Sequence, residues 1–148
     1  MTFSNQMNKL AEDFVTEAEK IIKEVVFRNA EEIVDGTPKD TGNLMANWDL
    51  AKDTTGERDP ISIKSPIERG VAKTKSMNRI TKGLSEYKVG DEQITIFNNV
   101  RYAEYVEEGN NNQRNSGWVS RQAIVMEKEL VRALNKLVNK LYAFSRRR

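Results

Sequence analysis

The 148-residue sequence contains no cysteine and no histidine. Without cysteine no disulfide can form, so nothing in the sequence points to an oxidising compartment. Zinc sites take nearly all their ligands from cysteine and histidine, so we expect no zinc site. General acid–base chemistry near neutral pH would have to rely on carboxylates or lysines of shifted pKa. We expect no metal, no cofactor and no enzymatic activity, because the motifs considered below favour structural roles.

Long apolar runs are missing as well. No stretch approaches the roughly 20 residues that a membrane-spanning helix needs, and Met1 to Lys9 lacks the apolar centre of a secretory signal. The sequence thus predicts a soluble protein, intracellular when made, with no membrane partner. Its length suits a single domain over residues 1–148 with one core.

Charge is nearly balanced but unevenly placed. The formal net charge is +2, which is too small to imply nucleic-acid binding by itself. The stretch from Lys64 to Lys88 holds seven basic residues against two acidic ones, and acidic residues gather near the N-terminus and at 104–108. Opposite patches on one chain favour association of identical copies, although basic residues also suit DNA phosphates. The candidate partner or DNA contacts are Lys64, Arg69, Lys73, Lys75, Arg79, Lys82, Arg146, Arg147 and Arg148.

An amphipathic pattern predicts a long N-terminal helix. Apolar residues recur every three or four positions from Met7 to Val26, which places them along one side of a helix. Ser4 is the candidate N-cap. Gly36 is expected to end the helix in a left-handed conformation, and Pro38 prevents its continuation.

The same spacing predicts a second long helix at the C-terminus. It runs from Ala123 to Phe144, with Ser120 as the candidate N-cap. The apolar side of each long helix must be buried against a sheet or against the other helix. The predicted fold is therefore α+β, with two long terminal helices packed on a small, mostly antiparallel sheet.

Short strands are predicted between the two helices. Residues 93–98 combine β-branched and aromatic side chains, and a Gly-Asp turn would let residues 87–89 pair with them as a hairpin. Alternating patterns at 48–50 and 61–63 indicate two shorter strands.

The basic stretch 64–88 has two interpretations. Its scattered apolar residues favour a long loop or arm that a neighbouring molecule orders. Alternatively, Ser76 caps a short helix that runs through Leu84.

Asp40-Thr41-Gly42 matches the triplet of aspartic proteases. That chemistry needs two such aspartates and an apolar strand before each, whereas Thr37, Pro38 and Lys39 precede this one. We interpret the triplet as a turn in which Asp40 or Thr41 caps a short helical turn. The carboxylates at 31–35 and 104–108 are interpreted as solvated helix faces rather than a magnesium site.

Two passages resemble the neck and tail-completion proteins of long-tailed phages, including minor tail protein Z-like members. Residues 37–44 (TPKDTGNL), followed by a tryptophan, are similar to a P-x-D-T-G-x-L…S-W signature. Residues 96–109 (IFNNVRYAEYVEEG) look like N-x-x-x-Y-A-x-x-(V/L)-E-x-G. The resemblance implies structural roles, in capping, turning and packing, for Asp40, Thr41, Gly42, Leu44, Trp48, Tyr102, Ala103, Glu107 and Gly109.

The resemblance implies a structural virion protein made in the host cytoplasm. Such a subunit forms a ring, sixfold or twelvefold, that joins the DNA-filled head to the tail. Its partners would be copies of itself, neighbouring neck and tail proteins, and DNA in the lumen. The basic stretch 64–88 departs from the family pattern. It leaves two alternatives, a nucleic-acid-binding module using that stretch and a tail terminator proper.

Overall fold

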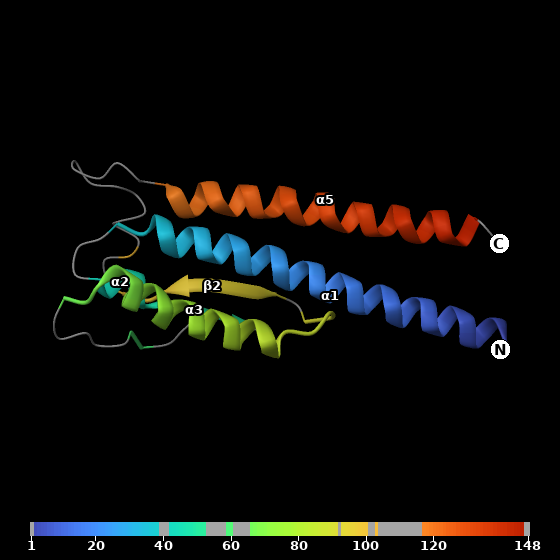
Figure 1. Ribbon diagram of the computed structural model, residues 1–148, viewed down its shortest axis with the longest axis horizontal. Coiled ribbons are helices and arrows are strands. Elements are labelled where there is room, and N and C mark those ends of the chain that lie inside the picture. The colour runs from blue at the N-terminus through green and yellow to red at the C-terminus, as the bar shows by residue number, and fades with distance from the viewer. Residues whose placement is uncertain are drawn as a thin grey trace.

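The computed structural model describes residues 2–38, 42–52, 59–60, 66–91, 93–100, 103 and 117–146. Two long helices, α1 (Phe3–Gly36) and α5 (Trp118–Arg146), run antiparallel along the length of the molecule (Figure 1). On the other side of α1 lie α3 (Arg69–Glu86), the short α2 (Asn43–Ala46) and a sheet of β1 (Trp48–Lys52) and β2 (Ile94–Asn98). The predicted α+β fold, with long terminal helices on a small antiparallel sheet, is confirmed.

Both long helices begin earlier than predicted. The N-cap of α1 is Thr2, whose Oγ1 accepts a hydrogen bond from the Asn5 amide at 3.2 Å. Ser4 therefore lies inside the first turn. Helix α5 begins at Trp118, so Ser120 is likewise helical.

Helix α1 ends where the sequence predicts, but by a different mechanism. Gly36 is helical, and the C-cap is Thr37 in an extended conformation (φ −64°, ψ 124°), followed by Pro38. What requires glycine is space, because a Cβ on Gly36 would lie 2.8 Å from Cδ1 of Trp118. The predicted left-handed stop is wrong.

The sheet joins segments that are far apart in the sequence. Strand β2 pairs antiparallel with β1, with Leu50 opposite Ile96. The predicted hairpin with 87–89 is wrong, since Val89 forms only an isolated bridge to Asp91. Asp91 closes that turn on itself, because its carboxylate accepts from the Lys88 amide at 2.8 Å. The predicted strand at 61–63 lies outside the described residues, as do the carboxylates at 104–108 that we interpreted as a solvated helix face.

Residues 69–86 form helix α3 rather than the predicted loop or arm. The helix begins well before Ser76, which sits on its buried side. The apolar pattern is hard to read because two of the buried positions are Ser76 and Gly83. These small residues let α3 approach β1 closely, so burial here does not require large apolar side chains. The buried residues of α3 are Ala72, Ser76, Met77, Ile80, Gly83 and Leu84.

Helix α3 covers the outer edge of β1. Ser76 Oγ accepts from the Trp48 amide at 3.0 Å and donates to the Met45 carbonyl. At Gly83 the helix lies so close that a Cβ would overlap the carbonyl oxygen of Leu50. Helix α3, instead of a third strand, thereby covers this edge of β1 and accepts a hydrogen bond from the Trp48 amide.

The core lies among α1, α2, β1 and α3. Its largest fully buried apolar side chains are Val34, Met45, Leu50 and Ile80. Among the side chains of α5 that the structure describes, only Trp118 is buried, and the main contacts of the helix are with α1. Among the described helices, none has the length and apolar content that crossing a bilayer requires.

Candidate assembly surface

Gly42 occupies the N-cap position of α2. It is left-handed (φ 83°), a conformation that favours glycine, and a Cβ there would lie 2.8 Å from Cγ1 of Ile67. The N-cap position of α2 is thus one or two residues later than the predicted Asp40 or Thr41. Asp40 and Thr41 themselves lie outside the described residues.

The other described motif residues hold the end of α1 against the sheet. The buried indole of Trp48 donates to Thr37 Oγ1 at 2.8 Å, and that hydroxyl donates to the Ile33 carbonyl at 3.0 Å. Leu44 belongs to the same buried cluster, and Ala103 packs against it. Tyr102, Glu107 and Gly109 lie outside the described residues.

Two of the predicted contact residues attach α3 to α1. Arg69 donates to the backbone carbonyls of Thr37 (3.3 Å) and Asp35. The Lys73 ammonium lies 3.0 Å from the Asp35 carboxylate and 3.5 Å from that of Glu31. The hydrogen bond to Asp35 is the main cause that raises the pKa of Lys73. These cations therefore face the protein's own carboxylates and carbonyls.

The remaining predicted contacts divide into anchored and exposed residues. Arg79 donates to the carbonyls of Trp48 (3.3 Å) and Ala46, both buried residues. The side chains of Lys75 and Lys82 are exposed and have no partner among the described residues. The Arg146 guanidinium lies 5.7 Å from the ring centroid of Tyr142. The other three, Lys64, Arg147 and Arg148, lie outside the described residues.

We expect Arg79→Met to lower the free energy of unfolding by about 1–3 kcal/mol, because two buried carbonyls lose a charged donor. Lys82→Met makes the same chemical change on the same helix at an exposed site, and we expect an effect within about 0.5 kcal/mol. Urea unfolding followed by circular dichroism measures both. Equal small effects would show that Arg79 does not support the fold.

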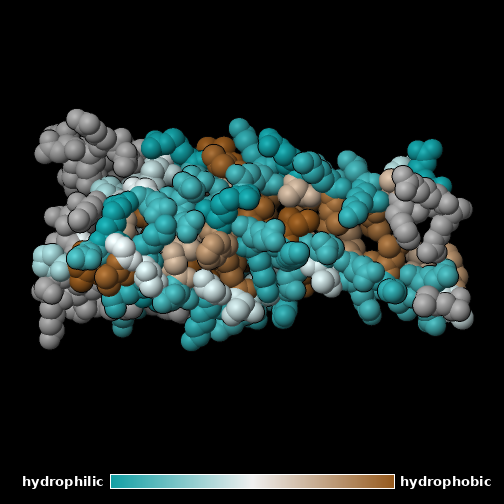
Figure 2. Space-filling view, in the orientation of Figure 1, coloured by the Kyte–Doolittle hydropathy of each residue, from teal (hydrophilic) through white to brown (hydrophobic). Residues whose placement is uncertain are grey.

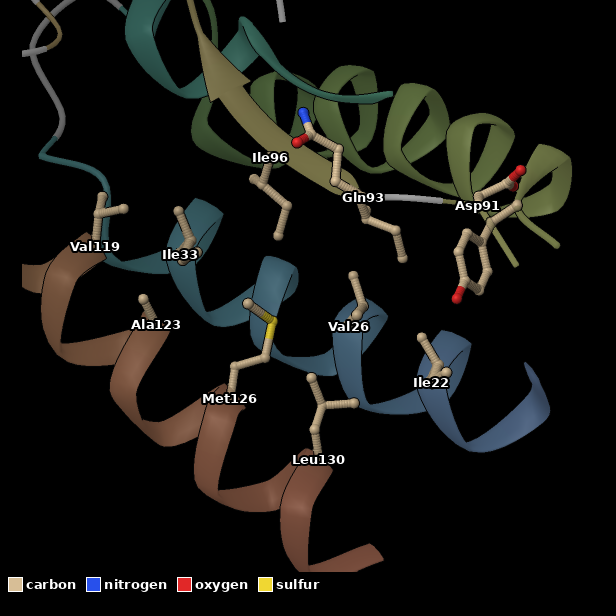
Figure 3. Close-up of a pocket in the computed structure, with 12 residues that line it drawn as sticks. Ile22, Val26, Ile33, Asp91, Gln93, Ile96, Val119, Ala123, Met126 and Leu130 are labelled. Atoms are coloured by element: carbon tan, nitrogen blue, oxygen red, sulfur yellow. The ribbon is translucent and has the colours of Figure 1, made fainter. Parts of the chain in front are cut away.

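An apolar recess of about 380 Å³ separates α5 from the sheet (Figure 3). Only three of its twelve lining residues have polar side chains: Tyr87, Asp91 and Gln93. Asp91 lies 3.8 Å from the Lys52 ammonium. Burial is the main cause that raises the pKa of Tyr87, and nearby Asp91 and Glu19 add to it. The lining therefore offers apolar contact and no pair of nucleophile and base.

A polar cluster fixes the register of α5 on α1. Glu129 accepts from Arg28 at 2.6 Å and from the Asn29 amide at 3.0 Å, and Gln122 donates to the Asn29 oxygen at 2.6 Å. The hydrogen bond from Arg28 is the main cause that lowers the pKa of Glu129. Asn29 is buried and its nitrogen also donates to the Val25 carbonyl of its own helix, so an alignment without Glu129 and Gln122 would leave the rest of its amide unpaired.

The outer halves of α1 and α5 project beyond the sheet and α3, toward the end that carries both termini (Figure 1). Apolar side chains gather along the seam between the two helices there (Figure 2). A groove of about 350 Å³ opens at this seam, lined by Leu10, Asp13, Phe14, Glu17, Leu137, Lys140, Leu141 and Ala143. This groove is a candidate interaction site, because apolar side chains there are open to solvent.

The profile of a family described as "Bacteriophage HK97-gp10, putative tail-component" matches residues 2–109. The chain belongs to this family. The match spans more than half of the sequence and contains α1 to β2. No curated protein and no solved structure matches the chain.

As a phage tail component, the protein is part of the virion and contacts other tail proteins. The predicted relation to phage tail and neck proteins is confirmed at that level. Among the described residues, most of the exposed large apolar side chains lie on α1 and α5, whereas most of the predicted contact residues lie on α3. The sequence predicted that the apolar residues of both long helices belong to the core or to a subunit interface, but it did not show which residues belong to which. The missed signal was a second apolar series in α5, at Ile124, Val131 and Val138.

Proposed function

We propose that this tail component is a structural subunit, without enzymatic activity, that forms a ring in the neck and joins the DNA-filled head to the tail. In this role it resembles tail-completion proteins of the minor tail protein Z-like kind. One observation carries the proposal: α1 and α5 form a projecting pair whose apolar seam the rest of the fold leaves open. Such a surface in a virion protein is explained by a neighbouring subunit.

We propose that the protein has no enzymatic activity because several of its polar side chains make contacts that stabilise the fold. Ser76, Lys73 and Arg79 all hold elements of the fold together. The described residues contain no group of three Asp or Glu side chains placed to hold a metal ion. The recess between α5 and the sheet is lined mainly by apolar side chains, and a smaller one beside β1 is lined by Asp49, Asp59 and Arg79 among others. These arrangements suit packing and assembly better than catalysis.

The rival nucleic-acid-binding function is weakened by α3. It would use the basic stretch, but Arg69, Lys73 and Arg79 contact the protein itself. Affinity for DNA scales with the number of phosphates neutralised, and only Lys75 and Lys82 of the predicted contacts in α3 project freely. We therefore propose that assembly, and not DNA binding, is the main role.

Native mass spectrometry of the full chain tests ring formation, and electron microscopy of particles carrying a labelled copy tests its position. We expect a single closed oligomer, with label at the junction of head and tail. Label along the tail tube or at its far tip would contradict the neck position. A purified chain that is monomeric and binds DNA tightly, with a steep dependence on salt, would support the rival function instead.

A further inference from the structure

Helix α5 carries a second apolar stripe that α1 does not cover. Its exposed fractions are 54% for Ile124, 54% for Val131, 48% for Val138 and 62% for Tyr142. The first three residues are seven apart, and seven residues make about two helical turns, so they lie in one row. A row of apolar residues at this spacing is typical of a seam between two helices. We name these four residues the α5 stripe.

The α5 stripe has a basic border. Lys128 and Arg132 lie on one side of Val131 and are exposed, whereas the exposed carboxylate of Glu127 lies on its other side. From Leu130 to the C-terminus the sequence has no acidic residue. A helix that covers the stripe should therefore bring carboxylates to its border.

The groove at the seam of α1 and α5 has an apolar centre and acidic residues at its border, which complements the α5 stripe. Its apolar lining comes from Leu10 and Phe14 of α1 and from Leu137 and Leu141 of α5. Asp13 and Glu17 stand at its border, exposed and without a partner among the described residues. Lys140 is the one basic residue in the lining. We name this site the acidic groove.

The two surfaces lie on opposite sides of α5. At about 100° per residue, Val138 and Tyr142 lie on one side of Leu137, and Lys140 and Ala143 on the other. A copy that offers its stripe to a neighbour thus keeps its own groove free. The lengths also agree, because Leu10 and Glu17, like Val131 and Val138, are seven residues apart, or about 10 Å of helix.

We propose that the α5 stripe of one copy docks into the acidic groove of the next copy. Val131 and Val138 fill the apolar centre, while Lys128 and Arg132 pair with Asp13 and Glu17 at the border. The contact joins two different surfaces of one chain, so it repeats head to tail and closes when the rotation between copies allows a ring. The inference deepens the proposed function, on which it rests, by naming the contact between subunits.

A charge swap tests the contact in the full-length protein. Lys128→Glu with Arg132→Glu, and separately Asp13→Lys with Glu17→Lys, should each weaken self-association at least tenfold in sedimentation velocity. All four substitutions together restore opposite charges, so we expect association to return to within about tenfold of the original, a difference of 1.4 kcal/mol. Lys75→Glu with Lys82→Glu makes an equal charge change on α3 and should leave association unchanged.

Val131→Glu with Val138→Glu tests the apolar centre, and circular dichroism checks that these exposed sites keep the fold. Loss of the oligomer with an intact helical spectrum supports the contact. Pair reversals that leave the oligomer intact, or a fourfold variant that stays dissociated, overturn it. Binding of the stripe to another tail protein by an otherwise monomeric chain also overturns it. If a neck ring still forms with every stripe variant, this inference is wrong but the proposed function stands. If the protein is absent from the neck, the proposed function is wrong.

Discussion

Gly83→Ala is expected to lower the free energy of unfolding by about 1–3 kcal/mol or more, because an added methyl group would overlap the backbone of β1. The new Cβ would collide with the carbonyl oxygen of Leu50 and lie 2.9 Å from its carbon. Backbone cannot rotate away as a side chain can. The helix or the strand must therefore move, and with it the hydrogen bond between Ser76 and Trp48.

Gly70→Ala is the matched control on the same helix. Nothing lies within 4 Å of a Cβ at Gly70, so the change should be neutral or stabilising by about 0.4–1 kcal/mol. Urea unfolding of both variants gives the comparison. If Gly83→Ala is as stable as Gly70→Ala, then α3 does not lie against β1 as closely as described.

Trp118→Ala is expected to cost about 3–5 kcal/mol, the range for removing a large buried aromatic side chain. Trp118 is the residue by which α5 enters the core. Its indole packs on Gly36 and donates to the Ile33 carbonyl at 3.0 Å. Without it the first turns of α5 lose their attachment to the end of α1.

Trp118→Phe separates packing from hydrogen bonding at this site. The smaller ring keeps most of the apolar contact but leaves the Ile33 carbonyl without its donor, so we expect a loss of about 1–3 kcal/mol. Chemical unfolding measures both variants, and hydrogen exchange reports on the start of α5. Equal losses for the two variants would mean that packing of the full indole contributes little.

The periodic elements of the fold follow from the sequence. Apolar residues repeated along α1 and α5 predict helices of nearly the observed extent, because burial on one side of a helix imposes its own spacing. The β-branched residues of β2 predict a strand for a similar reason. The two motifs also point to the phage tail family, which the profile match confirms.

The local sequence pattern did not predict which elements pack or pair with each other. Residues 87–89 are the near neighbours of β2, yet its partner is β1, more than forty residues away in the sequence. Of helix α3, only a short part from Ser76 to Leu84 was predicted, as one of two alternatives, because Ser76 and Gly83 interrupt its apolar pattern. Their small side chains are explained by the close approach of α3 to β1, which the sequence of α3 alone does not show.

The sequence by itself determined that the two terminal segments are helical and that residues 94–98 are extended, since periodicity and propensity act over a few neighbouring residues. Only the tertiary structure decided what the charges and stripes face. Arg79 and Lys75 look alike in the sequence, but Arg79 donates hydrogen bonds to backbone carbonyls, whereas the side chain of Lys75 is exposed to solvent. Likewise Leu137 and Val138 are adjacent, and the position of α1 leaves the valine outside. Burial depends on contacts between distant segments, so no local pattern contains it.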